Sequence, residues 1–149
     1  HEVLSTLTQA GQSATRALAA LRRVREVLDA CERAVADRPE VAAVHYPGLA
    51  SGADAELVAR QMRGPGSMLA IRLAGGYEAA STVAQSCRMI VHAVSLGGVD
   101  TLIQHPAALT HRPVPAEARP AADVLRLSVG LESAEAIIAD LEQALAQLA

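Results

Sequence analysis

Two residues whose side chains suit anion binding lie in apolar, glycine-containing segments of the chain. Arg126 stands between Leu125 and Leu127, and Ser95 directly precedes a Leu-Gly-Gly turn at residues 96–98. Burying the charge of an arginine in a strand is costly unless a carboxylate or phosphate pairs with it. The guanidinium fork binds a carboxylate through two parallel hydrogen bonds, and the glycines let the backbone approach a ligand closely. Arg126 and Ser95 are therefore candidate residues of a carboxylate-binding site.

Each candidate also has a purely structural interpretation, which the sequence leaves open. Arg126 would serve stability if it paired with a structural carboxylate or lay on a solvated face, and Ser95 would be an ordinary serine at the end of a strand. The five histidines are scattered without the spacing of metal ligands, so no metal site is predicted. The stretch 64–66 (Gly-Pro-Gly) lacks the spacing and the Lys-Ser/Thr ending of a phosphate-binding loop.

The composition narrows the classes of function. All 13 basic residues are arginines, so a reaction that needs a lysine amine must obtain it from elsewhere. The net charge of -3 and the near absence of aromatic residues argue against a nucleic-acid partner. No run of 18 apolar residues predicts a membrane span. Two cysteines make no disulfide framework, and no signal peptide opens the chain, so we expect a cytoplasmic protein.

Two further expectations follow from the same composition. The chain begins at His1 and not at methionine, which predicts a piece of a longer protein. Heavy use of alanine, with arginine in place of every lysine, indicates a GC-rich and hence bacterial genome.

Apolar periodicity predicts a single α+β domain. We expect two layers, a small and mostly antiparallel sheet covered by helices, preceded by a long amphipathic helix over residues 12–37. The apolar face of that helix would comprise Ala17, Leu21, Val24, Leu28, Cys31 and Val35. Strands are predicted over residues 41–46, 67–73, 91–95 and 124–129, and further helices over 54–62, 77–89 and after Ser133. Residues 105–121, which contain four prolines, are predicted to be a loop.

Local patterns predict how these elements begin and which side chains they bury. Ser51, with Asp54 three residues later, has the pattern of a capping box, and Ser133 is a second predicted N-cap. Alternation over 124–129 places Arg126 and Ser128 on one face and the apolar residues on the other. The final helix is predicted to bury Ala134, Ile138, Leu141, Leu145 and Leu148.

Five segments together resemble the C-terminal domain of the Cys/Met-metabolism family of pyridoxal-phosphate (PLP) enzymes. The family includes cystathionine γ-synthases, cystathionine lyases, methionine γ-lyases and sulfhydrylases. The segments are residues 44–49, 61–62 with 66–69, 93–98, 102–107 with 110–111, and 125–132. The resemblance extends from about residue 38 to the end, whereas residues 1–37 match only in helical character. It implies the C-terminal small domain of a fold-type I PLP enzyme.

The resemblance implies a role for each matched residue. Arg126 matches the arginine that grips the α-carboxylate of the substrate, and Ser95 matches the serine whose hydroxyl contacts the catalytic lysine. The backbone from Val94 to Leu96 would line the same carboxylate pocket. Many synthases and cystathionine γ-lyases carry Glu at the position of Val94, whereas methionine γ-lyases tend to carry an apolar residue. The resemblance thus favours a C–S lyase, with no catalytic or cofactor-binding residue in this chain.

The chain departs from the family pattern in three ways. Residues 50–53 replace a Ser-His-Pro-like turn, and the loop between Arg119 and Arg126 is shorter than usual. The large domain, which carries the Schiff-base lysine, the aspartate that pairs with the pyridine nitrogen and most phosphate contacts, is absent. We therefore expect a linking helix over 1–37 and a substrate-binding domain over 38–149 that is inactive alone.

These expectations lead to one preferred function and three alternatives. The preferred function is part of a PLP-dependent C–S lyase that performs β- or γ-elimination on cysteine, cystathionine or methionine. The alternatives are a transferase of the cystathionine γ-synthase or sulfhydrylase type, a cysteine lyase domain of a larger assembly such as a polyketide synthase, and a non-catalytic remnant that acts as a binding module. Expected partners are the amino-acid substrate, the missing large domain and further copies in a dimer or tetramer.

Overall fold

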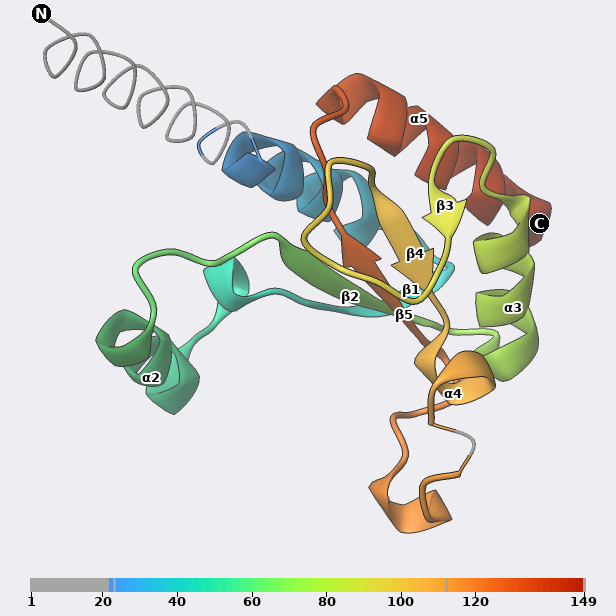
Figure 1. The fold of residues 1–149 in the computed structure, drawn as a ribbon, viewed down its shortest axis with the longest axis horizontal. Helices are drawn as coiled ribbons and strands as arrows, with labels where there is room; N and C mark the ends of the chain where they lie inside the picture. The colour runs from blue at the N-terminus through green and yellow to red at the C-terminus, as the bar shows by residue number, and fades with distance from the viewer. Residues whose placement is uncertain (1–21, 23, 112, 149) are drawn as a thin grey trace, which may run out of the picture.

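A five-stranded mixed sheet organises the protein. The computed structural model describes residues 22, 24–111 and 113–148 (Figure 1). In spatial order the strands are β1 (Val41–His45), β2 (Met68–Leu73), β5 (Val124–Ser128), β4 (Leu102–Gln104) and β3 (Val91–His92). The pairs β1–β2, β2–β5 and β4–β5 are antiparallel, and β3–β4 is parallel. The prediction of an α+β fold with a mostly antiparallel sheet is confirmed.

Helices complete the second layer and the connections. Besides a helix over residues 24–36, the structure contains α2 (Gly52–Gln61), α3 (Gly76–Ser86), α4 (Pro106–Leu109) and α5 (Ala134–Leu145), with 3-10 turns η1 (Pro47–Leu49), η2 (Ala116–Ala118) and η3 (Ala146–Leu148). The helix over 24–36, α3 and α5 share one apolar core with alternate residues of β2, β4 and β5. By contrast, α2 contains no buried residue and stands away from the body of the molecule (Figure 1).

Alternation along the strands separates the apolar core from a more polar face. On β5, Leu125 and Leu127 are fully buried in the core, as predicted. Strand register then aligns four residues of the opposite face in one row across the sheet. From β1 to β4 these are His45, Ala70, Arg126 and Gln104. The fold thus presents Arg126 on the face away from the covering helices.

Most of the predicted apolar positions are buried, with one correction in the last helix. Val24, Leu28, Cys31 and Val35 are buried, and the predicted Ala17 and Leu21 lie outside the described residues. In α5 the fully buried residues are Ile137, Leu141, Ala144 and Leu145, whereas the predicted Ala134, Ile138 and Leu148 are only partly buried. The buried residues still follow helical periodicity, but their stripe is turned toward Ile137 and Ala144, and α5 packs against α3.

The region around the second half of the sheet differs from the prediction in three places. The strand predicted over 91–95 is limited to β3, which ends at His92, and the strand β4 was missed because it is only three residues long. The predicted loop over 105–121 contains α4 and η2. The helix predicted over 77–89 ends at Ser86, because the carboxylate of Asp140 accepts hydrogen bonds from the next backbone amides, at Arg88, Met89 and Ile90.

The two predicted helix caps have different outcomes. Ser133 caps α5, since its hydroxyl oxygen accepts a hydrogen bond from the amide of Ala136 at 3.2 Å. Ser51 is the N-cap residue of α2, but its side chain makes no capping hydrogen bond. The capping-box prediction is therefore wrong in its side-chain contact, although Ser51 is the N-cap residue; α2 begins at Gly52, two residues before the predicted start.

Candidate functional site

Arg126 lies in the middle of β5, between Ala70 of β2 and Gln104 of β4. Its Nη2 donates a hydrogen bond to the backbone carbonyl of Ser95 at 2.9 Å. Its Nε is buried and has no hydrogen-bond partner within the described part of the chain. None of the ion pairs formed by the described residues includes Arg126. The guanidinium thus retains capacity to donate to an external acceptor.

A second arginine on the same face, Arg72, is paired with a carboxylate and provides a comparison for Arg126. Arg72 of β2 donates from Nε and Nη2 to the carboxylate of Asp123, with the shortest contact at 2.7 Å. Hydrogen bonding to Arg72 and its charge hold the pKa of Asp123 below its ordinary value of 3.8. Arg126 has no such carboxylate among the described residues, so pairing with a structural carboxylate does not account for it.

The loop between β3 and β4 carries the other three predicted residues. Val94 and Leu96 are 57% and 60% exposed, and Ser95 is exposed as well. They do not lie in a buried strand as predicted, because the chain leaves the sheet after β3 and turns at Gly97, whose φ is 73°. Ser95 meets Arg126 through its backbone carbonyl and not through its hydroxyl. Arg126, Ser95 and the flanking backbone are thereby brought together.

Gln104 is a polar residue of this site that the sequence reasoning missed. It is 2% exposed and stands directly across from Arg126. Its Nε2 donates to the hydroxyl of Thr110 at 2.8 Å, and that hydroxyl also contacts Nδ1 of His111 at 2.9 Å. The Oε1 of Gln104 has no partner among the described residues. Gln104, like Arg126, is a polar residue next to apolar residues in a strand. This pattern can be recognised only once β4 is known to be a strand.

The unpaired Nε of Arg126 and Oε1 of Gln104 explain what this site can bind. A buried polar atom without a partner costs about 1–3 kcal/mol, so such atoms normally meet a ligand, water or another part of the protein. Arginine offers only donors, and their planar arrangement matches the two oxygens of a carboxylate. The amide oxygen of Gln104, on the neighbouring strand, is an acceptor that is also without a partner among the described residues. The geometry therefore suits a carboxylate that approaches Arg126 past the exposed loop.

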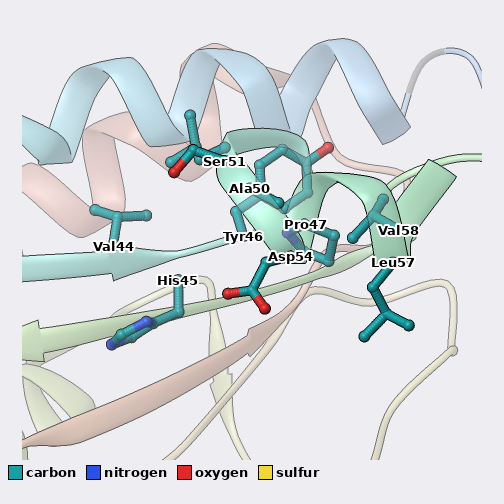
Figure 2. Close-up of a pocket in the computed structure, with 10 residues that line it drawn as sticks. Val44, His45, Tyr46, Pro47, Ala50, Ser51, Asp54, Leu57 and Val58 are labelled. Atoms are coloured by element: carbon teal, nitrogen blue, oxygen red, sulfur yellow. The ribbon is translucent and has the colours of Figure 1, made fainter.

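A separate cavity lies at the other edge of the sheet. It has a volume of about 510 Å³ and is bounded by β1, η1 and α2 (Figure 2). His45 and Asp54 extend into it, whereas the ring of Tyr46 points to the preceding helix, where its hydroxyl contacts Asp29 at 3.4 Å (Figure 2). Burial and the charge of Asp29 raise the pKa of Tyr46 to about 12. The cavity contains none of the predicted site residues and no unpaired buried polar atom of the described residues, so we assign it no ligand.

Histidines and acidic residues do not form a metal centre within the described ranges. No group of three or more His, Cys, Asp or Glu side chains is arranged to hold a metal ion there. His105 is a buried structural histidine, because its Nε2 donates to the carbonyl of Ala122 at 2.7 Å and its ring lies 4.8 Å from that of Tyr77. No helix within the described part of the chain is long and apolar enough to cross a membrane.

The chain itself cannot attach PLP covalently. The chain contains no lysine to form a Schiff base with PLP. Arg126 donates to the backbone carbonyl of Ser95 and has no carboxylate partner among the described residues. If PLP is bound as a Schiff base, its lysine must come from outside these 149 residues.

A small mixed sheet of this order, covered by helices, resembles the small domain of fold-type I PLP enzymes. Comparison with known sequences agrees, since the profile of the "Cys/Met metabolism PLP-dependent enzyme" family matches residues 21–146. The chain belongs to this family, and the resemblance found in the sequence is confirmed. The family depends on PLP.

The similar proteins are named for different activities, including a lyase and a synthase. The chain is 54% identical over 111 residues to an L-methionine γ-lyase of Brevibacterium sandarakinum, covering 74% of this chain and 28% of the relative. It is 44% identical over 128 residues to a cystathionine γ-synthase of Mycobacterium bovis, covering 84% and 33%. The crystal structure of cystathionine γ-synthase from Xanthomonas oryzae superimposes with a TM-score of 0.77 at 41% identity, covering 87% and 34%. The chain thus spans about a third or less of the length of these relatives.

Proposed function

We propose that this chain is the substrate-binding part of a PLP-dependent C–S lyase that acts on a sulfur amino acid. The observation that carries the proposal is the guanidinium of Arg126, half-buried at the centre of the sheet without a carboxylate partner among the described residues. Such a cation binds the α-carboxylate of an amino acid strongly, because a charge-assisted and bidentate pair is formed away from bulk water.

Each residue of the site has a distinct part in this proposal. Arg126 donates to the carboxylate from its guanidinium, and Gln104 stands directly across from it on the neighbouring strand. Val94, Ser95 and Leu96 close the carboxylate pocket on the exposed side. Fixing the carboxylate holds the substrate so that its reacting bonds meet the catalytic groups of the large domain. PLP, held by that domain, supplies the electron sink for elimination.

The choice of lyase over transferase rests on Val94 and on the relatives. An apolar side chain at position 94 cannot contact a second polar substrate as a glutamate would, which favours elimination from one simple amino acid. The identity to methionine γ-lyase of 54% exceeds the 44% to cystathionine γ-synthase. The structural match to a cystathionine γ-synthase supports the transferase as the second candidate. Release of a thiol and ammonia from L-methionine, against formation of cystathionine from cysteine and a homoserine ester, distinguishes the two.

The Arg126 proposal is tested by Arg126→Ala in the full-length protein that contains this chain. We expect the KM for the amino-acid substrate to rise and kcat/KM to fall by about 100-fold, since losing one partner of a desolvated charge pair costs about 2–5 kcal/mol. The absorbance of bound PLP should persist. Arg60→Ala, which removes an exposed arginine of α2, is the matched control and should leave both constants unchanged.

The opposite outcome is equally clear. If Arg126→Ala unfolds the protein and releases PLP, Arg126 serves stability, and the proposed role in substrate binding is wrong. If both variants retain full activity, the chain behaves as a non-catalytic binding module or its carboxylate site lies elsewhere.

A further inference from the structure

The loop between β3 and β4, residues 93–101, is exposed and yet tied closely to the segment that follows β5. Val99 is 64% exposed, but its carbonyl accepts a hydrogen bond from the amide of Leu131 at 2.8 Å. The amide of Gly97 donates to the hydroxyl of Ser128 at 3.0 Å. Figure 1 shows this loop sweeping across to the point where β5 leads into α5. An exposed loop that makes these bonds has a defined position.

The strongest of these ties joins Thr101 and Glu132. The amide of Thr101 donates to Oε1 of Glu132 at 2.7 Å, and its hydroxyl donates to Oε2 at 2.6 Å. The same hydroxyl accepts a hydrogen bond from the amide of Gly130 at 3.0 Å. Thr101 is fully buried. Both oxygens of one carboxylate are therefore used to hold the end of the loop.

Close backbone packing reinforces this contact. A Cβ atom at Gly130 would overlap the carbonyl oxygen of Val99 and the backbone of Asp100. Only glycine permits this approach of the two segments. Burial opposes the charge of Glu132, but the hydrogen bonds from Thr101 outweigh it and lower the pKa of this carboxyl below its ordinary value of 4.5. Glu132 is thus ionised at neutral pH and accepts through both oxygens.

We propose that Thr101 and Glu132 are positioning residues that fix the loop bearing Ser95 against Arg126. The inference rests on the proposed function. Arg126 stands on β5, and Ser95 stands on the loop, so the two halves of the carboxylate site belong to segments 31 residues apart. Glu132 continues from β5, and Thr101 ends the loop, so their contact sets the distance between the two halves. Neither side chain touches the substrate.

The test uses the full-length holoprotein with two pairs of variants. Thr101→Val removes the hydroxyl while keeping the shape, and Thr101→Ser restores it. Glu132→Gln removes the charge, and Asp100→Asn is its control, because Asp100 is an exposed carboxylate of the same loop. The measurements are hydrogen exchange of the amides over residues 94–101, and KM and kcat with L-methionine as the probe substrate.

We expect Thr101→Val and Glu132→Gln each to speed exchange over 94–101 and to raise KM by about tenfold, the effect of losing a hydrogen bond to a charged group. The kcat should change less than KM, and Thr101→Ser and Asp100→Asn should resemble the parent. A purely stabilising role would lower the melting temperature without changing KM, which would overturn the inference. Unchanged exchange in both variants would also overturn it.

The Arg126→Ala variant separates the two proposals. If Arg126→Ala raises KM but the Thr101 and Glu132 variants do not, the carboxylate site stands and the positioning role is wrong. If Arg126→Ala leaves KM unchanged, the proposed function itself is wrong, and the positioning role falls with it. If Glu132→Gln does not fold, the comparison of Thr101→Val with Thr101→Ser still decides the matter.

Discussion

Arg72 and Arg126 occupy the same face of neighbouring strands but have opposite surroundings. Arg72 is neutralised by Asp123, whereas Arg126 contacts only the carbonyl of Ser95 and keeps a buried Nε unpaired among the described residues. The difference cannot be predicted from the flanking sequences, because both arginines stand between apolar residues. What separates them is whether the fold brings a carboxylate within reach.

The pKa values of the two cysteines, Cys31 and Cys87, predict that both thiols are unreactive in the folded protein. Burial raises the pKa of Cys31 to about 11, and burial with the charge of Asp140 raises that of Cys87 to about 12. Both groups remain neutral thiols at pH 8, and the thiolate is the reactive form. We expect neither cysteine to be alkylated by iodoacetamide in the native protein, while both react in denaturant. Peptide mass mapping checks this, and labelling of Cys31 in the native state would contradict it.

At the scale of elements, the junction between α3 and β3 depends on one side chain from α5. The carboxylate of Asp140 accepts hydrogen bonds from the amides of Arg88, Met89 and Ile90, and the side-chain amide of Gln143 donates to it as well. The carboxylate of Asp140 thus binds the segment between α3 and β3 and joins it to α5. The 6% exposure of Asp140 indicates that water cannot replace it there.

Asp140→Ala should therefore destabilise the protein by about 3 kcal/mol, since buried amides lose charged acceptors. Burial opposes the charge of Asp140, but its backbone hydrogen bonds prevail and lower its pKa below 3.8. Because the pKa of Asp140 is lower in the folded state than in the unfolded state, the ionised carboxylate stabilises the fold at any pH above the unfolded pKa. This stabilisation is lost as the pH falls through the folded-state pKa. Urea unfolding should show the deficit of the variant at pH 7 and a smaller deficit below pH 3.8.

The matched control for that measurement lies two residues further along the same helix, on its exposed side. Glu142 is exposed and has only a 3.9 Å pair with Arg38, so Glu142→Ala should cost less than about 1 kcal/mol. An equal loss in both variants would mean that α5 tolerates no substitution there, and that the hydrogen bonds of Asp140 have no special weight.

At the scale of the whole molecule, the site is open on one side. Val94, Leu96, Val99 and Leu131 are apolar and 47–64% exposed around the loop that bears Ser95. The chain spans only 28% of the methionine γ-lyase it resembles. We propose that a large PLP-binding domain covers this side in the full protein, followed by the substrate-binding domain over 38–149. Most of the linking helix predicted over 1–37 lies outside the described residues. Assembly into a dimer or tetramer is part of the same proposal.

That organisation predicts a native polypeptide well above the 15.4 kDa of this chain. Intact-mass measurement of the protein from its source checks it, together with absorbance of bound PLP. A mass near 15.4 kDa would mean that the lysine is missing or lies on another subunit, and a binding module would then be the better interpretation.

The sequence by itself determined the fold class, the buried faces of the first helix and of β5, and the family, because these depend on local periodicity and on short motifs. The tertiary structure decided the remainder. It showed that β4 exists, because three residues become a strand only between two partners, and it placed Gln104 beside Arg126 by cross-strand register. It also ended α3 early, since Asp140 arrives from a helix about 50 residues away. Long-range contacts of this kind leave no local pattern, which is why Arg126 and Ser95 could be singled out from the sequence whereas Gln104 beside Arg126 could not.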